Sequence, residues 1–554
     1  RYHHLFATLL QHHHGRTANA GEVAELHRRA SAWYDAQRMP EPALEHALAA
    51  KDVDGAVQIV RTYATPRTLG GDPASALRWL DALPRERIEK NFELMLLQSV
   101  AYIADYQLVR AAETVERTEA LLDENSTPHQ RGAILGVRGS LGRMTGQGDL
   151  GTADLERARE LVAPDTFWFS MVSFQLGMNA MLTADVRRLG PALAEARAHH
   201  SRPEQVIIAV IAQTFTGQAE LARGHPEEAV ALANESFAWI DITEKVTAGR
   251  PLDAFPNALL AEAHLAWNEL EKARAFAERA AEHARRGFTI ALFESARTLA
   301  RVAEAQRDWE TATRAAGDAA RAIRNTGGSV LWYNAVDVLR YRIQLRRGDV
   351  QAAAQWIESA KILEVLAPWD FRRLAGLHCD TPLLLAARVR IEQERFDDAR
   401  AILEDVLLHA ISTGRLATQL EALVLLARAG GGVAILREAL DLASRPRFVR
   451  VFVDEGPAIL PLLERAAAGV SDRDFATRVL SAFDVPAKTV TDALSDREIE
   501  VLRIIASGAS NQDAAKKLFI ASGTVKKHLE NIYAKLNVRG RMEAIARARD
   551  LGVI

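Results

Sequence analysis

The sequence has 554 residues, 48% of them hydrophobic and 25% charged, which excludes a disordered or fibrous chain and predicts a soluble globular protein with a large core. It has no run of about 18 apolar residues, so we expect no membrane span. The net charge of −3 does not by itself predict a polyanionic partner, and the single cysteine, Cys379, excludes an internal disulfide and fits a reducing cytoplasm.

The first segment, residues 1–14, reads RYHHLFATLLQHHH and lacks the long apolar stretch of a signal peptide. It opens on Arg1, and we interpret the chain as a piece of a longer protein. Five histidines in this segment raise the hypothesis of a metal site, but no cysteine or carboxylate ligand set accompanies them, so we predict none. These histidines are His3, His4, His12, His13 and His14.

One sequence unit recurs through residues 15–443. It begins with a short polar break, and an alanine five residues after the start of that break opens an amphipathic helix. The alanines are Ala76, Ala111, Ala153, Ala229, Ala273, Ala312, Ala353 and Ala399. A recurrence of about 40 residues is typical of a two-helix unit stacked on its neighbours, and a small side chain lets two helices approach closely. The units resemble tetratricopeptide (TPR) repeats with lengthened helices, so we predict an all-α solenoid of TPR-like helical hairpins.

The repeats alone leave two functions open, a scaffold without a ligand and a curved surface that binds an effector or a protein partner. Trp168, Trp332 and Trp369 pack hairpins in the first case and line an effector groove in the second. Cys379 lies beside His378 and an aspartate, but no oxyanion donor accompanies it, so we predict no catalytic residue and no enzyme.

Residues 444–493 depart from the repeat and are predicted to hold terminal helices and a linker. RFVRVFV, residues 447–453, fits either a strand or a helix, and a fresh helix begins near Pro457. Residues 484–493 contain a proline and two threonines without an apolar face, which predicts a flexible linker.

Residues 494–554 carry 11 Lys and Arg against 7 Asp and Glu, a basic tail on an acidic body. Ser495 and Glu498 predict a capping box that starts the first of four helices. Ser510 can cap the second helix, in which Ala514, Ala515 and Leu518 face inward. Ser522 can cap a third helix that runs to about Leu536, and a fourth follows.

The third helix has two distinct faces when its residues are placed at 100° intervals. Its predicted core stripe consists of Val525, Leu529, Ile532, Tyr533 and Leu536. Lys527, Glu530 and Ala534 point away from that stripe, flanked by Lys526 and Thr524. A DNA major groove admits one helix, in which lysine can donate to guanine O6 and N7. The amides of the second helix, near Asn511, are placed to meet a phosphate.

The tail resembles the LuxR-type C-terminal helix-turn-helix over about 60 residues. The shared motif consists of Leu494, Arg497, Glu498, Glu500, Val501, Leu502, Gly508, Ser510, Asn511, Ile520, Thr524, Val525, Lys526, His528, Asn531, Ile532, Lys535, Leu536, Val538, Arg541 and Ala544. The resemblance implies that Lys526, Lys527 and Glu530 read bases, and that Thr524, Asn511 and Lys535 contact phosphates. Ser522 and Arg541 complete the predicted DNA-binding set. Glu530 departs from the basic residue often found there, so it either accepts from cytosine or repels phosphate.

The front of the chain, at residues 1–6 and 33–46, resembles the region that follows the ATPase module in large MalT-like, ATP-dependent LuxR-type regulators. The resemblance implies the order ATPase, winged helix, helical repeats and DNA-binding tail, with residues 1–14 as the remnant of the winged helix. No G-x-x-x-x-G-K-[ST] occurs, and the glycine-rich AGGGVA, residues 429–434, lacks the lysine and is predicted as an interhelical loop. We expect ATP only in the absent module and no cofactor here.

We therefore predict a cytoplasmic DNA-binding transcription regulator. Residues 15–443 would sense an effector and support oligomerisation, and residues 494–554 would bind double-stranded DNA. The predicted partners are DNA, further copies of the chain, a small-molecule inducer or regulatory protein in the repeat groove, and RNA polymerase, with no membrane. The alternative is a repeat scaffold whose basic tail binds a protein.

Overall fold

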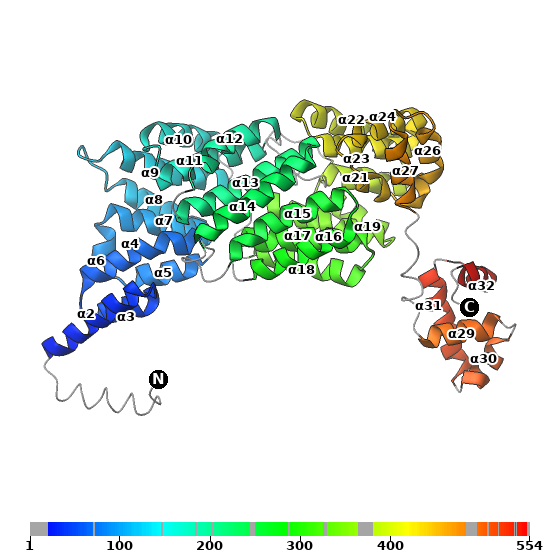
Figure 1. The fold of residues 1–554 in the computed structure, drawn as a ribbon, viewed down its shortest axis with the longest axis horizontal. Helices are drawn as coiled ribbons and strands as arrows, with labels where there is room; N and C mark the ends of the chain where they lie inside the picture. The colour runs from blue at the N-terminus through cyan, green and yellow to red at the C-terminus, as the bar shows by residue number, and fades with distance from the viewer. Residues whose placement is uncertain are drawn as a thin grey trace. The chain divides into compact units, whose positions relative to one another are not determined.

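The computed structural model divides the chain into two compact units, residues 1–479 and 480–554. It describes residues 20–69, 72–145, 148–182, 186–200, 203–243, 250–285, 289–324, 330–363, 381–483, 496–506, 509–518, 520–536, 538 and 540–550. All regular elements within these ranges are helices (Figure 1). The predicted linker, the five N-terminal histidines, Trp369 and Cys379 lie outside the described residues.

The first unit consists of helices in close succession. They are α2 (Ala20–Ala36), α3 (Pro40–Ala49), α4 (Val53–Leu69), α5 (Pro73–Asp81), α6 (Arg85–Glu89), α7 (Phe92–Ala104), α8 (Leu108–Glu119), α9 (Pro128–Met144), α10 (Gly148–Leu161), α11 (Phe167–Leu182), α12 (Val186–Ala198), α13 (Pro203–Arg223), α14 (Pro226–Thr243), η1 (Pro251–Asp253), α15 (Ala254–Ala266), α16 (Leu270–Ala284), α17 (Thr289–Ala305), α18 (Trp309–Arg324), α19 (Val330–Arg346), α20 (Val350–Ser359), α21 (Pro382–Glu392), α22 (Phe396–Thr413), α23 (Leu416–Leu426), η3 (Ala427–Gly431), α24 (Gly432–Ser444), α25 (Arg450–Val453), η4 (Pro457–Ile459), α26 (Leu460–Ala467) and α27 (Arg473–Ser481).

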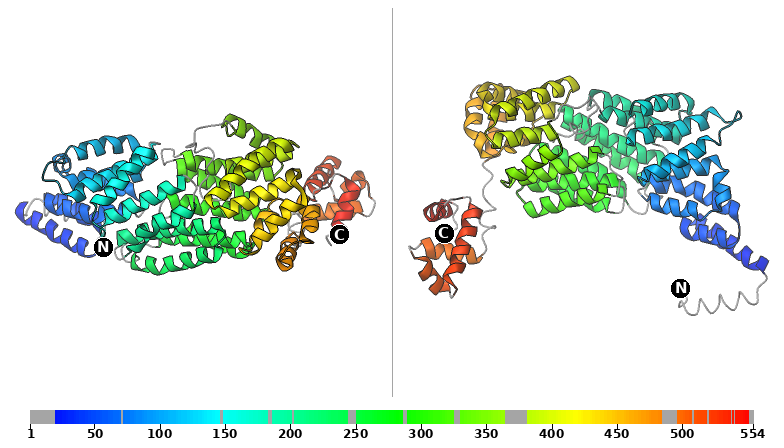
Figure 2. Two further views of the ribbon diagram at one scale, coloured as in Figure 1. Left: turned by 90° about the horizontal axis from the view of Figure 1, so that it is seen from above. Right: turned by 180° about the vertical axis from the view of Figure 1, so that it is seen from behind.

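Neighbouring helices of this unit pack as hairpins, which stack on one another (Figures 1 and 2). Thus α13 packs on α14, and the first helix of one hairpin packs on the first helix of the next, as α13 does on α15 and α15 on α17. Helices distant in sequence also meet, because α13 contacts both α4 and α23. These contacts confirm the predicted all-α solenoid of TPR-like hairpins.

Most copies of the recurring unit share one backbone feature, a left-handed residue at their first position. That residue adopts a positive φ after the preceding helix, where a left-handed residue ends a helix and satisfies its last carbonyls. These residues are Tyr106, Gly224, Asn268, Arg307, Gly348 and Glu394. The alanine five positions later is then fully buried against the partner helix, and the buried set is Ala76, Ala111, Ala229, Ala273, Ala312, Ala353 and Ala399.

Ala153 does not fit this pattern, because it is exposed. Helix α10 already includes Gly148, the first residue of that unit, so the helix begins earlier and its buried face shifts. Gly151 takes the place of the small inward residue, since a Cβ on Gly139 of α9 would lie 2.8 Å from the Gly151 carbonyl oxygen. The prediction for Ala153 was therefore wrong, and a glycine pair gives the close approach.

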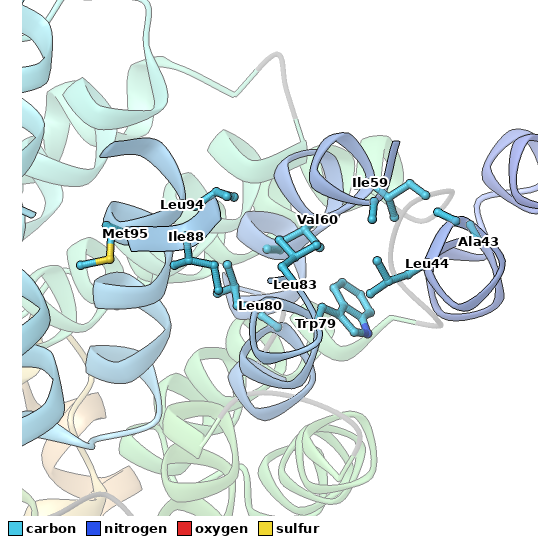
Figure 3. Close-up of a cluster of buried hydrophobic side chains, with 14 residues drawn as sticks. Ala43, Leu44, Ile59, Val60, Trp79, Leu80, Leu83, Ile88, Leu94 and Met95 are labelled. Atoms are coloured by element: carbon cyan, nitrogen blue, oxygen red, sulfur yellow. The ribbon is translucent and has the colours of Figure 1, made fainter. Parts of the chain in front are cut away.

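The apolar cluster drawn in Figure 3 extends from one hairpin to the next. In the cluster of Figure 3, Leu44 comes from α3, Val60 from α4, Leu80 from α5 and Leu94 from α7, and all four are buried. Full burial of such a side chain contributes about 1.5–3 kcal/mol. Because the contacts cross hairpin boundaries, each hairpin stabilises its neighbours.

The stretch Leu416–Ser444 is long and apolar enough, by composition, to cross a membrane. Its backbone breaks at AGGGVA, where Gly430 has a φ of 98° and Gly432 a φ of 81°, as the prediction of an interhelical connection requires. Leu420 and Val424 are fully buried against neighbouring helices, so we interpret the stretch as two core helices. Within RFVRVFV, residues 450–453 form α25, which settles that ambiguous segment as helical there.

The second unit contains four helices in its described residues. These are α29 (Asp496–Ala506), α30 (Asn511–Leu518), α31 (Ser522–Leu536) and α32 (Arg541–Asp550). They share one apolar cluster that includes Val501 of α29, Ala514 of α30, Ile532 of α31 and Ala544 of α32, each fully buried. The four helices predicted for the tail are thus present. Ser495 and Gly508, the predicted start and stop signals of the first, lie outside the described residues.

Candidate nucleic-acid interface

The third helix of the tail, α31, is anchored by one apolar face. Val525 and Ile532 are fully buried and Leu529 nearly so, and Tyr533 packs against the same cluster. These positions recur at the 3.6-residue period of an amphipathic helix. The predicted core stripe is confirmed at these four residues, whereas the side chain of Leu536 lies outside the described residues.

The opposite face of α31 is exposed and basic. Thr524, Lys526, Lys527 and Glu530 are all exposed. Within the described part of the chain, neither lysine has an acidic side chain within ion-pair distance. Because the buried stripe fixes the rotation of the helix, this face is held outward as one ridge. The side chain of Lys535 is outside the described residues.

Ser522 lies at the start of this ridge and is exposed. It is the first residue of α31 rather than the cap that the sequence predicts, because the amide of Val525 donates to the carbonyl oxygen of Ala521 at 3.3 Å. The helix thus starts one residue earlier than expected. The Ser522 hydroxyl lies in the first turn, where backbone amides remain free of helical partners.

The preceding helix, α30, begins with a reciprocal cap. The Ser510 hydroxyl donates to Asp513 Oδ2 at 2.6 Å, and the Asp513 amide donates back to Ser510 Oγ at 3.2 Å. The hydrogen bonds from Ser510 hold the pKa of the Asp513 carboxyl below its usual range. Asn511, the first residue of α30, is partly exposed beside this cap. The predicted capping role of Ser510 is confirmed.

Two arginines tie the helices of the tail together. Arg497 Nη2 donates to the carbonyl oxygen of Leu518, the last residue of α30, at 2.6 Å. Arg541 Nη2 donates to the carbonyl oxygens of Ile505 at 3.2 Å and Ala509 at 2.6 Å. A guanidinium stabilises carbonyl groups at a helix C-terminus through charge as well as hydrogen bonding. Arg541, predicted as a DNA contact, thus holds the end of α29 and the start of the turn.

Two further lysines belong to the same basic unit but are missing from the predicted set. Lys516 and Lys517 of α30 are exposed, while Ala515 and Leu518 next to them are buried. The inward residues of this helix were predicted correctly from the sequence. The same periodicity places both lysines on the outer side of α30, so the pattern contained the signal for them.

Comparison with known proteins defines the class. Residues 155–468 match the family described as MalT-like TPR region, and residues 492–548 match the family described as bacterial regulatory proteins, luxR family. The first match covers more than half of the chain, so the chain belongs to the MalT-like TPR family, and it ends in a LuxR-family helix-turn-helix DNA-binding domain. Both resemblances seen in the sequence are confirmed.

Individual relatives are HTH-type transcriptional regulators called MalT. The protein of Serratia proteamaculans (strain 568) is 25% identical, and that of Yersinia pestis (strain Pestoides F) is 26% identical. Each alignment covers 99% of this chain and 64% of the relative, so the chain spans less than two thirds of their length. A solved structure, the APC/C hetero-tetramer Cut9-Hcn1, covers 83% of this chain and 96% of its own at 13% identity, but its TM-score of 0.29 is too low to establish a shared fold.

Proposed function

We propose that this chain is a transcription regulator that binds double-stranded DNA through the exposed ridge of α31. The observation that carries the proposal is that Lys527 projects from the helix face opposite the buried residues Val525 and Ile532, with the exposed Lys526 at the flank of that face. An α-helix fits the major groove, where lysine donors reach guanine O6 and N7 and an exposed carboxylate accepts from cytosine N4. Lys526, Lys527 and Glu530 are the proposed base-reading residues.

The residues around the ridge supply the phosphate contacts in this proposal. Thr524 and Ser522 lie in the first turn of α31, and Asn511 lies in the first turn of α30, where free backbone amides favour an anion. Lys535 extends the basic ridge along the helix. Such contacts fix orientation on the duplex without reading sequence. We assign Arg541 a positioning role, because its guanidinium already binds two backbone carbonyls.

The repeat unit is proposed to sense an effector, either a small-molecule inducer or a regulatory protein, and to govern the DNA-binding unit. A single reading helix covers few base pairs, so we propose that copies of the chain associate on DNA to raise avidity. Contact with RNA polymerase and a cytoplasmic location follow from the role of a transcription regulator. Any ATP requirement is proposed for the part of the MalT relatives that this chain does not span.

A salt titration of duplex binding tests the proposal. The full chain is titrated against a preferred duplex by fluorescence anisotropy at several salt concentrations. Binding should weaken as a power of salt, with a logarithmic slope of about −0.9 per neutralised phosphate. Lys527→Ala should lower affinity on the preferred duplex, whereas Lys90→Ala, which removes an exposed lysine paired with Glu86 in the first unit, should not. Salt-independent binding, or equal affinity of both variants, would favour the protein-binding tail instead.

A further inference from the structure

Asn531 lies on the exposed side of α31, and the proposed DNA-binding residues do not include it. Its side chain is exposed, whereas Ile532, the next residue along the helix, is fully buried. In the sequence it stands only as one position of the shared motif, with no contact assigned to it. Its direction, its chemistry and its neighbours on α31 give it a specific role at the DNA.

Helix geometry places Asn531 beside Lys527 at the centre of the exposed ridge. At 100° per residue, the two side chains lie about 40° apart around the helix axis. Asn531 lies about 145° from the middle of the apolar face, compared with about 115° for Glu530 and about 75° for Lys526. Asn531 therefore faces outward more directly than either of these residues. The apolar face consists of Val525, Leu529, Ile532 and Tyr533.

The Asn531 carboxamide is not used to hold the tail together. Among the residues that the structure describes, none donates to this group or accepts from it. An exposed asparagine in a helix adds no stability by itself, because its short polar side chain competes with the backbone for hydrogen bonds. One acceptor oxygen and two N–H donors therefore face the outside of the ridge.

Gly523, one turn before Lys527, leaves room for a close approach at the start of this ridge. It lies about 40° from Lys527 around the helix axis, on the other side from Asn531. A Cβ at Gly523 would meet no described atom within 4 Å. The packing of the chain therefore does not require glycine here, although glycine is a poor helix former. A partner surface comes nearer to the helix at a residue without a side chain, so a short asparagine can reach it.

The ammonium and carboxamide groups of the ridge match different purine edges. Lysine donates to O6 and N7 of guanine, whereas asparagine accepts from N6 of adenine and donates to N7 of the same base. Lys527 and Asn531 are one helical turn apart, about 6 Å along the axis of α31. Successive nucleotides of a DNA strand are spaced about 3.4 Å along the duplex. The two residues are thus spaced to meet base pairs one or two steps apart.

We propose that Asn531 reads an adenine that lies one or two base pairs from the guanine contacted by Lys527. Its Oδ1 accepts from adenine N6, and its Nδ2 donates to adenine N7. The inference deepens the proposed DNA-binding function and rests on it. Because a carboxamide carries no charge, this contact adds sequence preference without adding to the salt dependence of binding.

Replacement of single atoms in the DNA tests the proposal on the full chain. A preferred duplex is first selected from a randomised library. Each adenine is then replaced in turn by 7-deazaadenine, which keeps the base pair but lacks the N7 acceptor. Fluorescence anisotropy measures the Kd of each duplex. Replacement at one adenine should weaken wild-type binding about fivefold. Asn531→Ala should bind the unmodified duplex about tenfold more weakly, with an unchanged salt slope, and should lose no further affinity on replacement of that adenine.

Three further variants show whether the effect belongs to Asn531. Asn531→Asp keeps the shape of the side chain but lacks the Nδ2 donor, so it should also be insensitive to replacement of that adenine. Lys527→Ala should keep the loss at the adenine and become insensitive to 7-deazaguanine at the neighbouring guanine. Asn125→Ala, which removes an exposed carboxamide in the first unit, should bind every duplex as the wild type does.

Two results would overturn the proposal. One is wild-type binding that 7-deazaadenine leaves unchanged at every adenine, a result that needs no variant to fold. The other is an undiminished loss at the same adenine in Asn531→Ala and Asn531→Asp, with folding checked by circular dichroism. The proposed function fails separately, because absent or salt-independent duplex binding would overturn DNA binding itself. Salt-dependent binding without an adenine contact would overturn only the role of Asn531.

Discussion

The guanidinium of Arg541 donates from Nη2 to the backbone carbonyl oxygen of Ala509 at 2.6 Å, across 32 residues of sequence. The same nitrogen reaches the carbonyl oxygen of Ile505 at 3.2 Å. This arrangement fixes α32 against the junction between α29 and α30. Arg541 of the last helix therefore helps to position α30, which carries the exposed Lys516 and Lys517.

Replacing Arg541 by alanine should loosen this junction. Loss of charge-assisted hydrogen bonds typically costs about 1.5–3 kcal/mol each, so we expect a destabilisation of about 1–3 kcal/mol in the second unit. Hydrogen exchange followed by mass spectrometry should show faster exchange of peptides covering residues 501–515. Lys517→Ala, an exposed change in the same unit, should leave exchange near wild type. Unchanged exchange in Arg541→Ala would remove the positioning role.

Glu530 is expected to set base preference. An exposed carboxylate on the reading ridge accepts from cytosine N4, whereas glutamine at the same position donates to and accepts from adenine. Glu530→Gln should therefore shift the preferred base at one position of the site from cytosine to adenine, with discrimination of about 1–3 kcal/mol. Selection from a randomised duplex library followed by sequencing measures this. A uniform rise in affinity without a change of preference would instead show that Glu530 only repels phosphate.

The buried hairpin alanines should be intolerant of larger side chains. Ala229→Leu inserts three carbons where the wild-type side chain is fully buried, and such overpacking costs about 1–3 kcal/mol. Ala153→Leu is the matched control, because Ala153 is exposed and surface changes stay within about 0.5 kcal/mol. All nine tryptophans lie in the first unit, so urea unfolding followed by Trp fluorescence reports on it alone. Equal midpoints for the two variants would contradict the close-approach role.

The buried carboxylates of Asp454 and Glu455, which follow α25, should make the first unit sensitive to acid. Burial alone would raise the pKa of Asp454, but the guanidinium groups of Arg450 and Arg342 outweigh it and hold the pKa below its usual range. Burial also opposes ionisation of Glu455, and Arg388 and Arg428 likewise lower its pKa.

A carboxyl whose pKa is lowered by folding stabilises the protein above its unfolded pKa, near 4, and loses this contribution as the pH falls through the folded value. Urea unfolding by Trp fluorescence should therefore show stability falling as the pH drops below about 4. Asp454→Asn should be less stable at pH 7 and less sensitive to acid. A pH dependence identical to wild type would argue against Asp454 as a charge partner of Arg342 and Arg450.

The local features of this protein were predictable from sequence because they depend on near neighbours. The 3.6-residue period placed Val525, Leu529 and Ile532 in the core and Lys527 outside, and both follow from helix geometry. The prediction that Ala153 packs between helices was wrong because the face on which a residue lies depends on where α10 begins. The start of a helix is set by the backbone of the preceding turn.

The long-range contacts of residues 445–456, which contain α25, were not predictable. Trp267 and Pro446 are 179 residues apart, and Arg342 and Asp454 are 112 apart, so no local pattern records their contact. The segment RFVRVFV was ambiguous in the sequence, and it did not reveal that Asp454 and Glu455, which follow it, pair with Arg342 of α19, Arg388 of α21 and Arg428 of η3. The carbonyl oxygens that accept from Arg541 could not be predicted either, because a position in a sequence motif does not show which backbone oxygen a side chain reaches.

Protection of lysines by DNA tests most directly whether the α31 ridge contacts the duplex. The full chain is treated with an amine-acetylating reagent with and without a saturating duplex, and acetylation at each lysine is followed by mass spectrometry. Lys526 and Lys527 should react several-fold more slowly in the complex, whereas Lys90 and Lys272 of the first unit should react at unchanged rates. Saturated duplex binding with undiminished acetylation of both Lys526 and Lys527 would contradict the account.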